Sequence, residues 1–255
     1  MIPHVGTIAC VAVRLKSSRL PGKAMLPLAG EPVILRLTES LRRAKRIDDI
    51  VWCTSTHPQD DPLEELAVEK GINVYRGDEL DVMSRFIEVA WGRKAHTIVR
   101  VTGDNPLTDP GMMDVMIDAH RAGAAEYTYT EDLPRGTRSE IMSVAALERC
   151  HDLVEDPSAS EYMTLMIRRP DHFKVLKVDA PDARLKRPEL RLTIDAPEDL
   201  AVVSAVFEAF GGMPPSLADV IGWLDQHPDI ATKNAAVPTQ EIGPAINVRL
   251  RGDRA

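Results

Sequence analysis

A chain of 255 residues, 44% hydrophobic and 27% charged, has the length and composition of a globular protein built as one large domain or as one domain with a small appendage. Its formal net charge of −8 and its aromatic content of 4% argue against general nucleic-acid binding, which needs basic surface and stacking aromatic side chains. No apolar run approaches the ~20 residues of a membrane span, and the N-terminus lacks the charged-then-apolar order of a signal peptide, so we expect a cytoplasmic protein without a membrane partner.

In the first half of the chain, strand-like and helix-like patterns alternate. Short apolar runs predict strands at 7–13, 50–54, 72–75 and 97–102. Amphipathic patterns with start and stop signals predict helices at 33–44, 61–70, 81–93 and from 110 onward. Cys10 and Cys53 lie inside two of the strands, so we expect both to be buried and reduced. Repeated β–α–β units imply a mostly parallel sheet with helices on both faces.

The region 127–178 is less regular. It predicts strands near 127–130, 137–143 and 173–178, and helices near 144–153 and 158–168. We interpret it as an inserted lobe within a main domain at 1–235, whose last helix lies at 216–226. The apolar stripe Met163, Met166 and Ile167 fits either self-association or the core, and 236–255 is predicted to be an arm or tail.

A basic loop follows the first predicted strand. Residues 14–23 read R-L-K-S-S-R-L-P-G-K and contain four basic side chains, Arg14, Lys16, Arg19 and Lys23. Such side chains bind phosphate oxygens, and Gly22 lets the backbone come close to a ligand. A solvated surface loop is the alternative interpretation. We favour a polyanion site, because the cluster runs against the negative charge of the chain.

Two further loops place a carboxylate where a buried strand ends. Asp104 lies in R-V-T-G-D-N-P-L-T-D-P (100–110), and Asp195 lies in L-T-I-D-A-P-E-D-L (192–200) at the start of a helix. Each could be a turn or cap residue when considered alone. Because open α/β sheets bind ligands at this edge and Mg²⁺ takes carboxylates together with substrate phosphates, the three loops predict a nucleoside triphosphate–Mg²⁺ site. No G-x-x-x-x-G-K-[ST] or G-x-G-x-x-G pattern occurs, which excludes a P-loop and disfavours a dinucleotide fold.

At these loops the sequence resembles the cytidylyltransferases that activate acidic sugars. The 14–23 loop is similar to the signature loop of the 3-deoxy-manno-octulosonate (Kdo) cytidylyltransferases and of the spore-coat polysaccharide protein F (SpsF) family. The 100–110 and 193–200 loops look like R-x-T-G-D-x-P-L-x-D-P and T-x-D-x-P-E-D-L of the latter family, and 76–86 and 217–228 fit it too. The resemblance implies a single three-layer α/β/α domain with a Rossmann-like sheet of the nucleotide-diphospho-sugar transferase (GT-A-like) type, CTP as substrate and a homodimer.

The resemblance also implies a role for each matching position. The triphosphate contacts would be Arg14, Lys16, Ser17, Ser18, Arg19 and Lys23. The Mg²⁺ ligands would be Asp104 and Asp195, which with Arg19 and Lys23 would carry catalysis. The contacts of the base or ribose would be Thr54, Ser55, Asp81 and Arg85, although a helix cap and a surface charge are open alternatives for the last two.

The acceptor side departs from the family pattern. Residues 160–167 read S-E-Y-M-T-L-M-I where the family has R-E-H-V-T-P-Y-I, and 136–140 keeps the G-x-x-x-E spacing. We expect Arg135, Arg138 and Glu140 in the inserted acceptor and dimerisation lobe to meet an anionic acceptor. A nonulosonate- or Kdo-like sugar acid is the first choice, and a phosphonate or phosphate is the second.

The reaction implied is attack of an acceptor oxygen on the α-phosphate of CTP with release of pyrophosphate. Two other classes compete with this hypothesis. A glycosyltransferase of related topology would hold its metal through a D-x-D pair, which the predicted strand ends lack. A non-catalytic nucleotide-binding scaffold would not need both aspartates and the complete basic loop.

Overall fold

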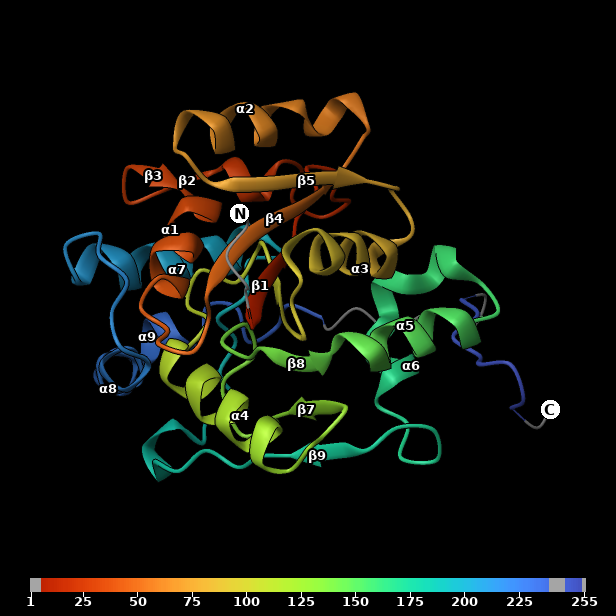
Figure 1. The fold of residues 1–255 in the computed structure, drawn as a ribbon. Helices are drawn as coiled ribbons and strands as arrows, with labels where there is room; N and C mark the ends of the chain where they lie inside the picture. The colour runs from red at the N-terminus through yellow and green to blue at the C-terminus, as the bar shows by residue number, and fades with distance from the viewer. Residues whose placement is uncertain (1–5, 239–245, 254–255) are drawn as a thin grey trace.

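The computed structural model describes residues 6–238 and 246–253, and its centre is a seven-stranded sheet in the order β5-β4-β1-β6-β8-β7-β9 (Figure 1). The strands are β1 (Thr7–Ala12), β4 (Asp49–Ser55), β5 (Asn73–Gly77), β6 (Thr97–Thr102), β7 (Tyr127–Tyr129), β8 (Glu140–Ser143) and β9 (Val175–Lys177). β8 pairs antiparallel with both of its neighbours, and the other pairs are parallel. The predicted mostly parallel α/β sheet is therefore confirmed.

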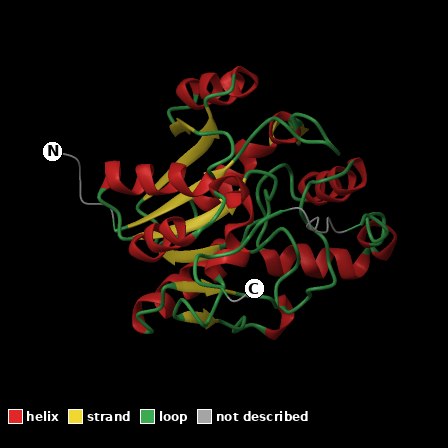
Figure 2. Ribbon diagram, turned by 90° about the vertical axis from the view of Figure 1, so that its right-hand side faces the viewer, coloured by secondary structure: helices red, strands yellow, loops and turns green. Residues whose placement is uncertain are grey.

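Helices cover both faces of this sheet, which forms the middle layer in Figure 2. The helices are α1 (Val33–Leu41), α2 (Asp61–Glu69), α3 (Val82–Arg93), α4 (Pro110–Ala122), α5 (Val144–Leu153), α6 (Met163–Ile167), α7 (Pro197–Ala209), α8 (Leu217–Gln226) and α9 (Pro228–Ala231). Short 3₁₀ helices are η1 (Lys23–Met25), η2 (Pro58–Asp60), η3 (Pro157–Tyr162) and η4 (Ala183–Leu185). None of the helices in the described ranges is long and apolar enough to cross a membrane.

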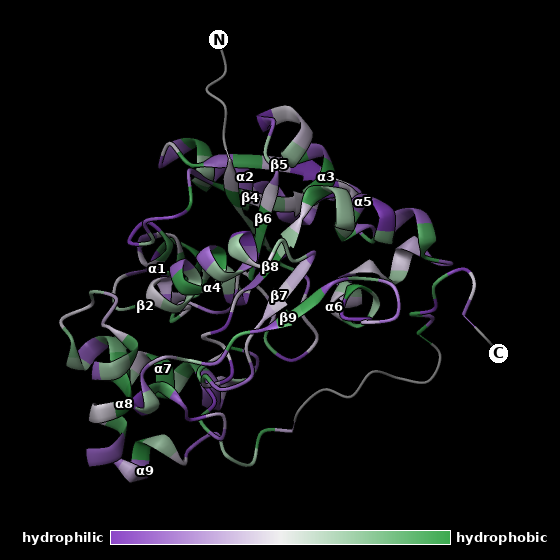
Figure 3. Cartoon of the chain, turned by 60° about the horizontal axis from the view of Figure 1, so that its bottom comes forward, coloured by the Kyte–Doolittle hydropathy of each residue, from purple (hydrophilic) through white to green (hydrophobic). Residues whose placement is uncertain are grey.

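The alternation of side chains along β1 divides the core into two clusters. Ala9 and Val11 point into the cluster formed with α1, α2, α4, α7 and α8. Ile8 and Cys10 point into the opposite cluster, formed with α3, α5 and α6. Because both faces of β1 are covered, its sequence is a continuous apolar run without polar alternation. In Figure 3, α4 shows both hydrophobic and hydrophilic positions, as expected of a helix with one face on a sheet.

The order of the strands fixes where a ligand can bind. From β1 the chain continues to β4 and β5 on one side, while β6 pairs with the other edge of β1. The loops that leave β1 and β6 diverge at this reversal and open a crevice beyond the carboxyl ends of the two strands. The basic loop follows β1 and Asp104 follows β6, so the topology brings these two predicted site segments together.

Several predicted boundaries differ from the structure. The hairpin of β2 (Pro27–Leu28) and β3 (Glu31–Pro32) was not predicted, because two-residue strands carry no periodicity. The predicted strand 137–143 is wrong over its first three residues, since Gly136 at φ +91° and the Thr137 N–H···O=C Pro134 bond of 3.2 Å form a turn there. The predicted helix at 158–168 is 3₁₀ over η3 and α-helical only in α6. The helix at 216–226 is not the last one, because α9 begins at Pro228 directly behind it.

The region 127–178 and the described part of the tail pack onto the main sheet. β7, β8 and β9 join that sheet through β6. Met163, Met166 and Ile167 are fully buried, so the stripe belongs to the core and gives no support to self-association. Leu250 is buried and forms a β-bridge with Val154 at the end of α5. The rest of the predicted tail, 239–245 and 254–255, lies outside the described residues.

His120 on α4 makes the stability of the fold depend on pH. The side chain is 4% exposed, and Nδ1 lies 2.9 Å from Oγ1 of Thr128. Burial, with a smaller effect of Arg121, lowers the pKa of His120 from 6.5 to about 4. Between these values the unfolded chain binds the proton and the folded chain does not, so stability is complete above pH 6.5 and is lost as the pH falls toward 4.

We therefore expect the free energy of unfolding to fall by about 1.4 kcal/mol for each pH unit between about pH 6 and pH 4 because of His120 alone. Urea denaturation of the wild type and of His120→Gln at a series of pH values isolates this contribution, because all other groups are shared. An equal pH slope in the two proteins would contradict the assignment.

Candidate active site

The basic loop between β1 and η1 is held in place by Asp60 at the end of η2. The Leu15 N–H donates to Oδ1 of Asp60 at 2.8 Å, and the Gly22 N–H donates to the carbonyl of Leu15 at 3.0 Å. Gly22 has φ +68°, a left-handed conformation that glycine adopts without strain. Asp60 is buried and also accepts from Oγ of Ser55 at 2.5 Å. Asp60 was not identified from the sequence, because the predicted helix begins at the next residue, Asp61.

The two segments that carry the predicted metal ligands are tied together through their backbones. The Ile194 N–H donates to the carbonyl of Asp104 at 2.9 Å. Gly103 packs directly on the β1 segment, since a Cβ at this position would lie 2.7 Å from Cγ2 of Val13. These contacts place both carboxylates beside the end of the basic loop.

Lys23 lies between the two carboxylates. Its Nζ is 2.5 Å from Oδ2 of Asp104 and 2.8 Å from Oδ1 of Asp195. Burial lowers the pKa of Lys23, but the two carboxylates outweigh this effect and raise the pKa overall. Burial acts to raise the pKa of Asp195, and Lys23, Arg19 and Arg191 together hold it below its usual value. The ammonium group shows that a cation fits between these two aspartates, so the donor set also suits a divalent ion.

Asp199 orients Asp195 from the protein interior. It is fully buried and accepts from the N–H groups of Asp195 at 2.9 Å and Ala196 at 3.0 Å. It also accepts from Nε of Arg191 at 2.7 Å and from Nδ2 of Asn234 at 2.9 Å. Ala196 is the N-cap residue of α7, so the interpretation of Asp195 as a helix cap is wrong. The carboxylate of Asp195 faces the basic loop instead. The second Asp of D-A-P-E-D (195–199) is the sequence signal that could have identified this role.

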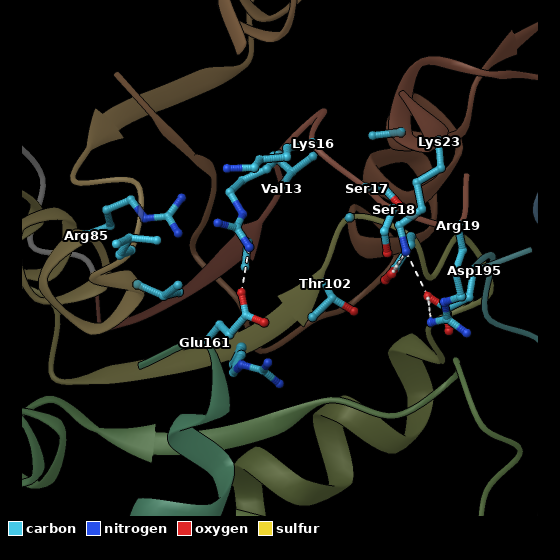
Figure 4. Close-up of a pocket in the computed structure, with 18 residues that line it drawn as sticks. Val13, Lys16, Ser17, Ser18, Arg19, Lys23, Arg85, Thr102, Glu161 and Asp195 are labelled. Carbon is cyan, nitrogen blue, oxygen red and sulfur yellow. Dashed lines mark hydrogen bonds and ion pairs between the residues drawn. The ribbon is translucent and has the colours of Figure 1, made fainter. Parts of the chain in front are cut away.

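The basic loop and the two aspartates Asp104 and Asp195 line a pocket of about 570 Å³ (Figure 4). The predicted residues that line it are Arg14, Lys16, Ser17, Ser18, Arg19, Lys23, Arg85, Asp104 and Asp195. Glu161 lines it as well and accepts from Nη2 of Arg14 at 2.5 Å. The sequence resemblance had not assigned a role to Glu161. The structure thus brings the basic loop and both aspartates into one cavity.

Three of the predicted base or ribose contacts do not line this pocket. Thr54 and Ser55 are fully buried at the end of β4, and Ser55 is bonded to Asp60. Asp81 caps α3 by accepting from the Ser84 N–H at 3.0 Å, and it lies 2.6 Å from Nε2 of His151. Arg85 covers the end of β4, where Nη1 donates to the carbonyl of Cys53 at 3.0 Å, and burial lowers its pKa.

A second pocket of about 380 Å³ adjoins the first, and the two share Arg100 and Thr102. The predicted acceptor residues Arg135, Arg138 and Glu140 all line it. Glu140 accepts from Nη1 of Arg100 at 2.7 Å, and it also accepts from Tyr127 and Thr164. Glu140 therefore joins Arg100, Tyr127 and Thr164, and so holds the wall of the pocket in place.

The second pocket carries excess positive charge. Four arginines line it, Arg100, Arg135, Arg138 and Arg168, together with two acidic residues, Glu131 and Glu140. Arg138 donates to the carbonyl of Leu133 and has no carboxylate within ion-pair distance in the part of the chain that the structure describes. Burial lowers its pKa. The pocket therefore suits an anionic ligand.

Three buried polar atoms in this wall have no hydrogen-bond partner among residues 6–238 and 246–253: Oδ1 of Asn105, Oγ1 of Thr130 and Nε of Arg100. Unsatisfied buried polar groups are rare in native proteins. Two of the three, Asn105 and Thr130, offer an amide and a hydroxyl to a ligand with several polar groups.

Comparisons with known proteins agree with this geometry. The profile of the family described as "Cytidylyltransferase" matches residues 8–213. The spore coat polysaccharide biosynthesis protein SpsF of Bacillus subtilis is 36% identical over 234 residues, which is 89% of this chain and 97% of that protein. A 3-deoxy-manno-octulosonate cytidylyltransferase of Trichlorobacter lovleyi is 33% identical over 111 residues, 44% of this chain and 43% of that protein. The solved structure of a cytidylyltransferase from Leptospira borgpetersenii superposes with a TM-score of 0.80 at 26% identity, covering 93% of this chain and 99% of that one.

Proposed function

This chain belongs to the cytidylyltransferase family, and we propose that it transfers CMP from CTP to a sugar acid with release of pyrophosphate. It is a nucleotidyltransferase, and the observation that carries the proposal is the arrangement of the first pocket. There the basic loop after β1, Asp104 after β6 and Asp195 before α7 meet in one cavity. Such a set matches a triphosphate with its divalent cation.

The basic loop supplies the binding of the triphosphate. Arg14, Arg19 and Lys23 present guanidinium and ammonium donors to the pocket, and Ser17 and Ser18 add hydroxyl groups. These donors would neutralise the charge that develops on the leaving pyrophosphate, and they are already oriented by the anchored loop. Because the loop backbone is fixed through Leu15 and Asp60, little movement of the backbone is needed when the nucleotide binds.

Asp104 and Asp195 are the residues that would hold Mg²⁺, since their carboxylates already face one cation, Lys23. When bound there, such an ion would reduce the repulsion between the anionic acceptor and the α-phosphate. The reaction forms one bond between the acceptor oxygen and the α-phosphorus and breaks the bond from that phosphorus to pyrophosphate, while the proton of the acceptor hydroxyl is released to solvent. The residues of the chain bind, orient and neutralise charge, and we assign no protein base.

The second pocket supports an acidic acceptor. It adjoins the first at Arg100 and Thr102, so a molecule held there would lie next to the nucleotide. Arg138 offers a guanidinium without a carboxylate partner in the described ranges, which suits a carboxylate ligand. The unpartnered oxygens of Asn105 and Thr130 suit sugar hydroxyls. The similarity to SpsF and to Kdo cytidylyltransferases agrees with a sugar acid in polysaccharide biosynthesis.

Pyrophosphate release tests the whole proposal. The purified protein is incubated with Mg²⁺, with CTP, UTP, GTP or ATP, and with a Kdo-like sugar acid, its carboxylate-free sugar analogue or a phosphonate. We expect release with CTP and the sugar acid. We expect the Arg138→Gln variant to raise the KM for the acid by about tenfold, since a charged hydrogen bond contributes roughly 1.5 kcal/mol or more.

The other outcomes identify which part is wrong. Equal release with all four nucleotides would remove the cytidine assignment. Release with the phosphonate and not with the sugar acid would show that the acceptor is a phosphonate. Nucleotide binding without release from any combination would favour the non-catalytic scaffold alternative, and absence of nucleotide binding would overturn both.

A further inference from the structure

Each basic side chain of the loop at 14–23 is paired with a carboxylate of the protein. Arg14 lies 2.5 Å from Glu161 and Lys16 lies 3.0 Å from Glu79. Arg19 lies 3.2 Å from Asp195. Lys23 bridges both predicted metal ligands, as Figure 4 shows for Asp195. The protein's own carboxylates therefore occupy the groups that would bind a triphosphate.

The pairing also neutralises Asp104 and Asp195, the two predicted metal ligands. Both oxygens of Asp195 have cationic partners, since Oδ1 faces Lys23 and Arg19 and Oδ2 lies 3.0 Å from Arg191. Three cations, Lys23, Arg19 and Arg191, thus face three carboxylates, those of Asp104, Asp195 and Asp199. The charges joined by these ion pairs balance, Arg135 adds further positive charge toward Asp195 and Asp199, and all side chains of the cluster except Arg19 are largely shielded from water. A divalent cation that entered alone would meet no excess negative charge and would have to displace the ammonium group of Lys23.

A triphosphate changes this balance. Its oxygens compete with carboxylates for Lys23 and Arg19, because both form charge-assisted hydrogen bonds with phosphate. The lysine side chain has a flexible four-carbon stem and can exchange partners without moving the loop backbone. Once Lys23 turns to phosphate, its ammonium group no longer neutralises the negative charges of Asp104 and Asp195, and the position between the two carboxylates is open.

We propose that Lys23 closes the metal site until a nucleotide triphosphate draws it away, so that nucleotide and divalent cation bind together. This inference rests on the proposed function, since it requires CTP in the first pocket. Lys23 is thus a positioning residue for the two aspartates as well as a phosphate contact. By thermodynamic linkage, CTP raises the affinity for the metal by the same factor by which the metal raises the affinity for CTP.

Binding of Mn²⁺, followed by electron paramagnetic resonance of the free ion, tests this coupling without any turnover. The affinity is measured for the wild type and for Lys23→Gln, each with and without saturating CTP, with CTP and Mn²⁺ alone as the blank. We expect Lys23→Gln without CTP to bind Mn²⁺ at least about tenfold more tightly than the wild type without CTP. We also expect CTP to raise the affinity of the variant much less than that of the wild type.

A matched variant separates this effect from a general change of charge. Lys16→Gln makes the same substitution in the same loop, but Lys16 pairs with Glu79 and touches neither aspartate. We expect its Mn²⁺ affinity without CTP to equal that of the wild type. Arg19→Gln removes a more exposed partner of Asp195, so it folds readily and should raise the affinity by a smaller factor than Lys23→Gln.

The outcomes distinguish this inference from the proposed function. If CTP binds the wild type but neither Lys23→Gln nor Arg19→Gln tightens Mn²⁺ binding, the coupling is wrong and the proposed function stands. An equal gain in Lys16→Gln would also overturn the coupling. Failure of CTP to bind the wild type would overturn both.

Discussion

Replacement of Asp104 by Asn is expected to lower kcat for pyrophosphate release by about 10³-fold, because loss of a ligand of the proposed Mg²⁺ site would remove several kcal/mol of charge stabilisation in the transition state. The side chain keeps its size, and its neighbours Gly103 and Ile194 keep their backbone contacts. We therefore expect the variant to remain folded. Initial rates at saturating CTP and acceptor give kcat, and circular dichroism with thermal unfolding reports the fold.

Asp179→Asn is the control for this experiment, since Asp179 is exposed and lies 4.0 Å from its nearest ion-pair partner, Lys186. Asp195→Asn should lower kcat as much as Asp104→Asn does. The double variant should lose little more than either single one, because residues that act as one unit are not additive. A kcat within tenfold of the wild type in a folded Asp104→Asn protein would show that this carboxylate holds no catalytic metal.

The position of this site could be predicted from the sequence because parallel strands share one edge. The apolar runs at 7–13 and 97–102 are buried on both faces and are too short to be helices, so their type was unambiguous. Any residue directly behind two such strands must lie at the same end of the sheet. The basic loop and Asp104 therefore lie at the same end of the sheet, which follows without any knowledge of their contacts.

Contacts between distant segments could not be predicted in this way. Glu161 meets Arg14 across 147 positions of the chain, and η3, which carries Glu161, is a 3₁₀ segment without a clear periodic signal. Ser160 fixes that segment by accepting from the Val82 N–H at 2.6 Å. A local pattern contains no information on such pairs.

Thr54 and Ser55 show the same limit at a strand end. Their place behind β4 was consistent with a base contact, but the structure directs both side chains into the protein. Ser55 bonds to Asp60, and Arg85 reaches across the strand end to Cys53. The direction of the last side chains depends on η2 and α3, which pack there from other parts of the chain.

Replacement of Asp199 by Ala is expected to lower the free energy of unfolding by about 3–5 kcal/mol, since removal of one partner leaves the rest of a buried ion pair uncompensated. Arg191, which is 9% exposed at its side chain, would lose its bidentate partner, and the N–H groups of Asp195 and Ala196 would lose their acceptor. Urea denaturation at neutral pH measures the loss. Asp182→Ala, which breaks an exposed pair with Arg184 and removes the N-cap of η4, should cost much less stability than Asp199→Ala.

The same substitution links stability to function, because the contacts of Asp199 are those that orient Asp195. In Asp199→Ala, Arg191 retains its contact of 3.0 Å with Asp195 and has no competing carboxylate, so it should draw Asp195 away from Lys23. We therefore expect turnover to fall even at temperatures where the variant is folded. Asp199→Asn can keep one oxygen as the acceptor for the two N–H groups, but it loses the charge and replaces the acceptor of Arg191 Nε and Asn234 Nδ2 by a donor, so it should recover only part of the stability. If both variants unfold like the wild type, the buried cluster does not hold the start of α7, and the position of Asp195 must be fixed by Ile194 and the backbone of Asp104 alone.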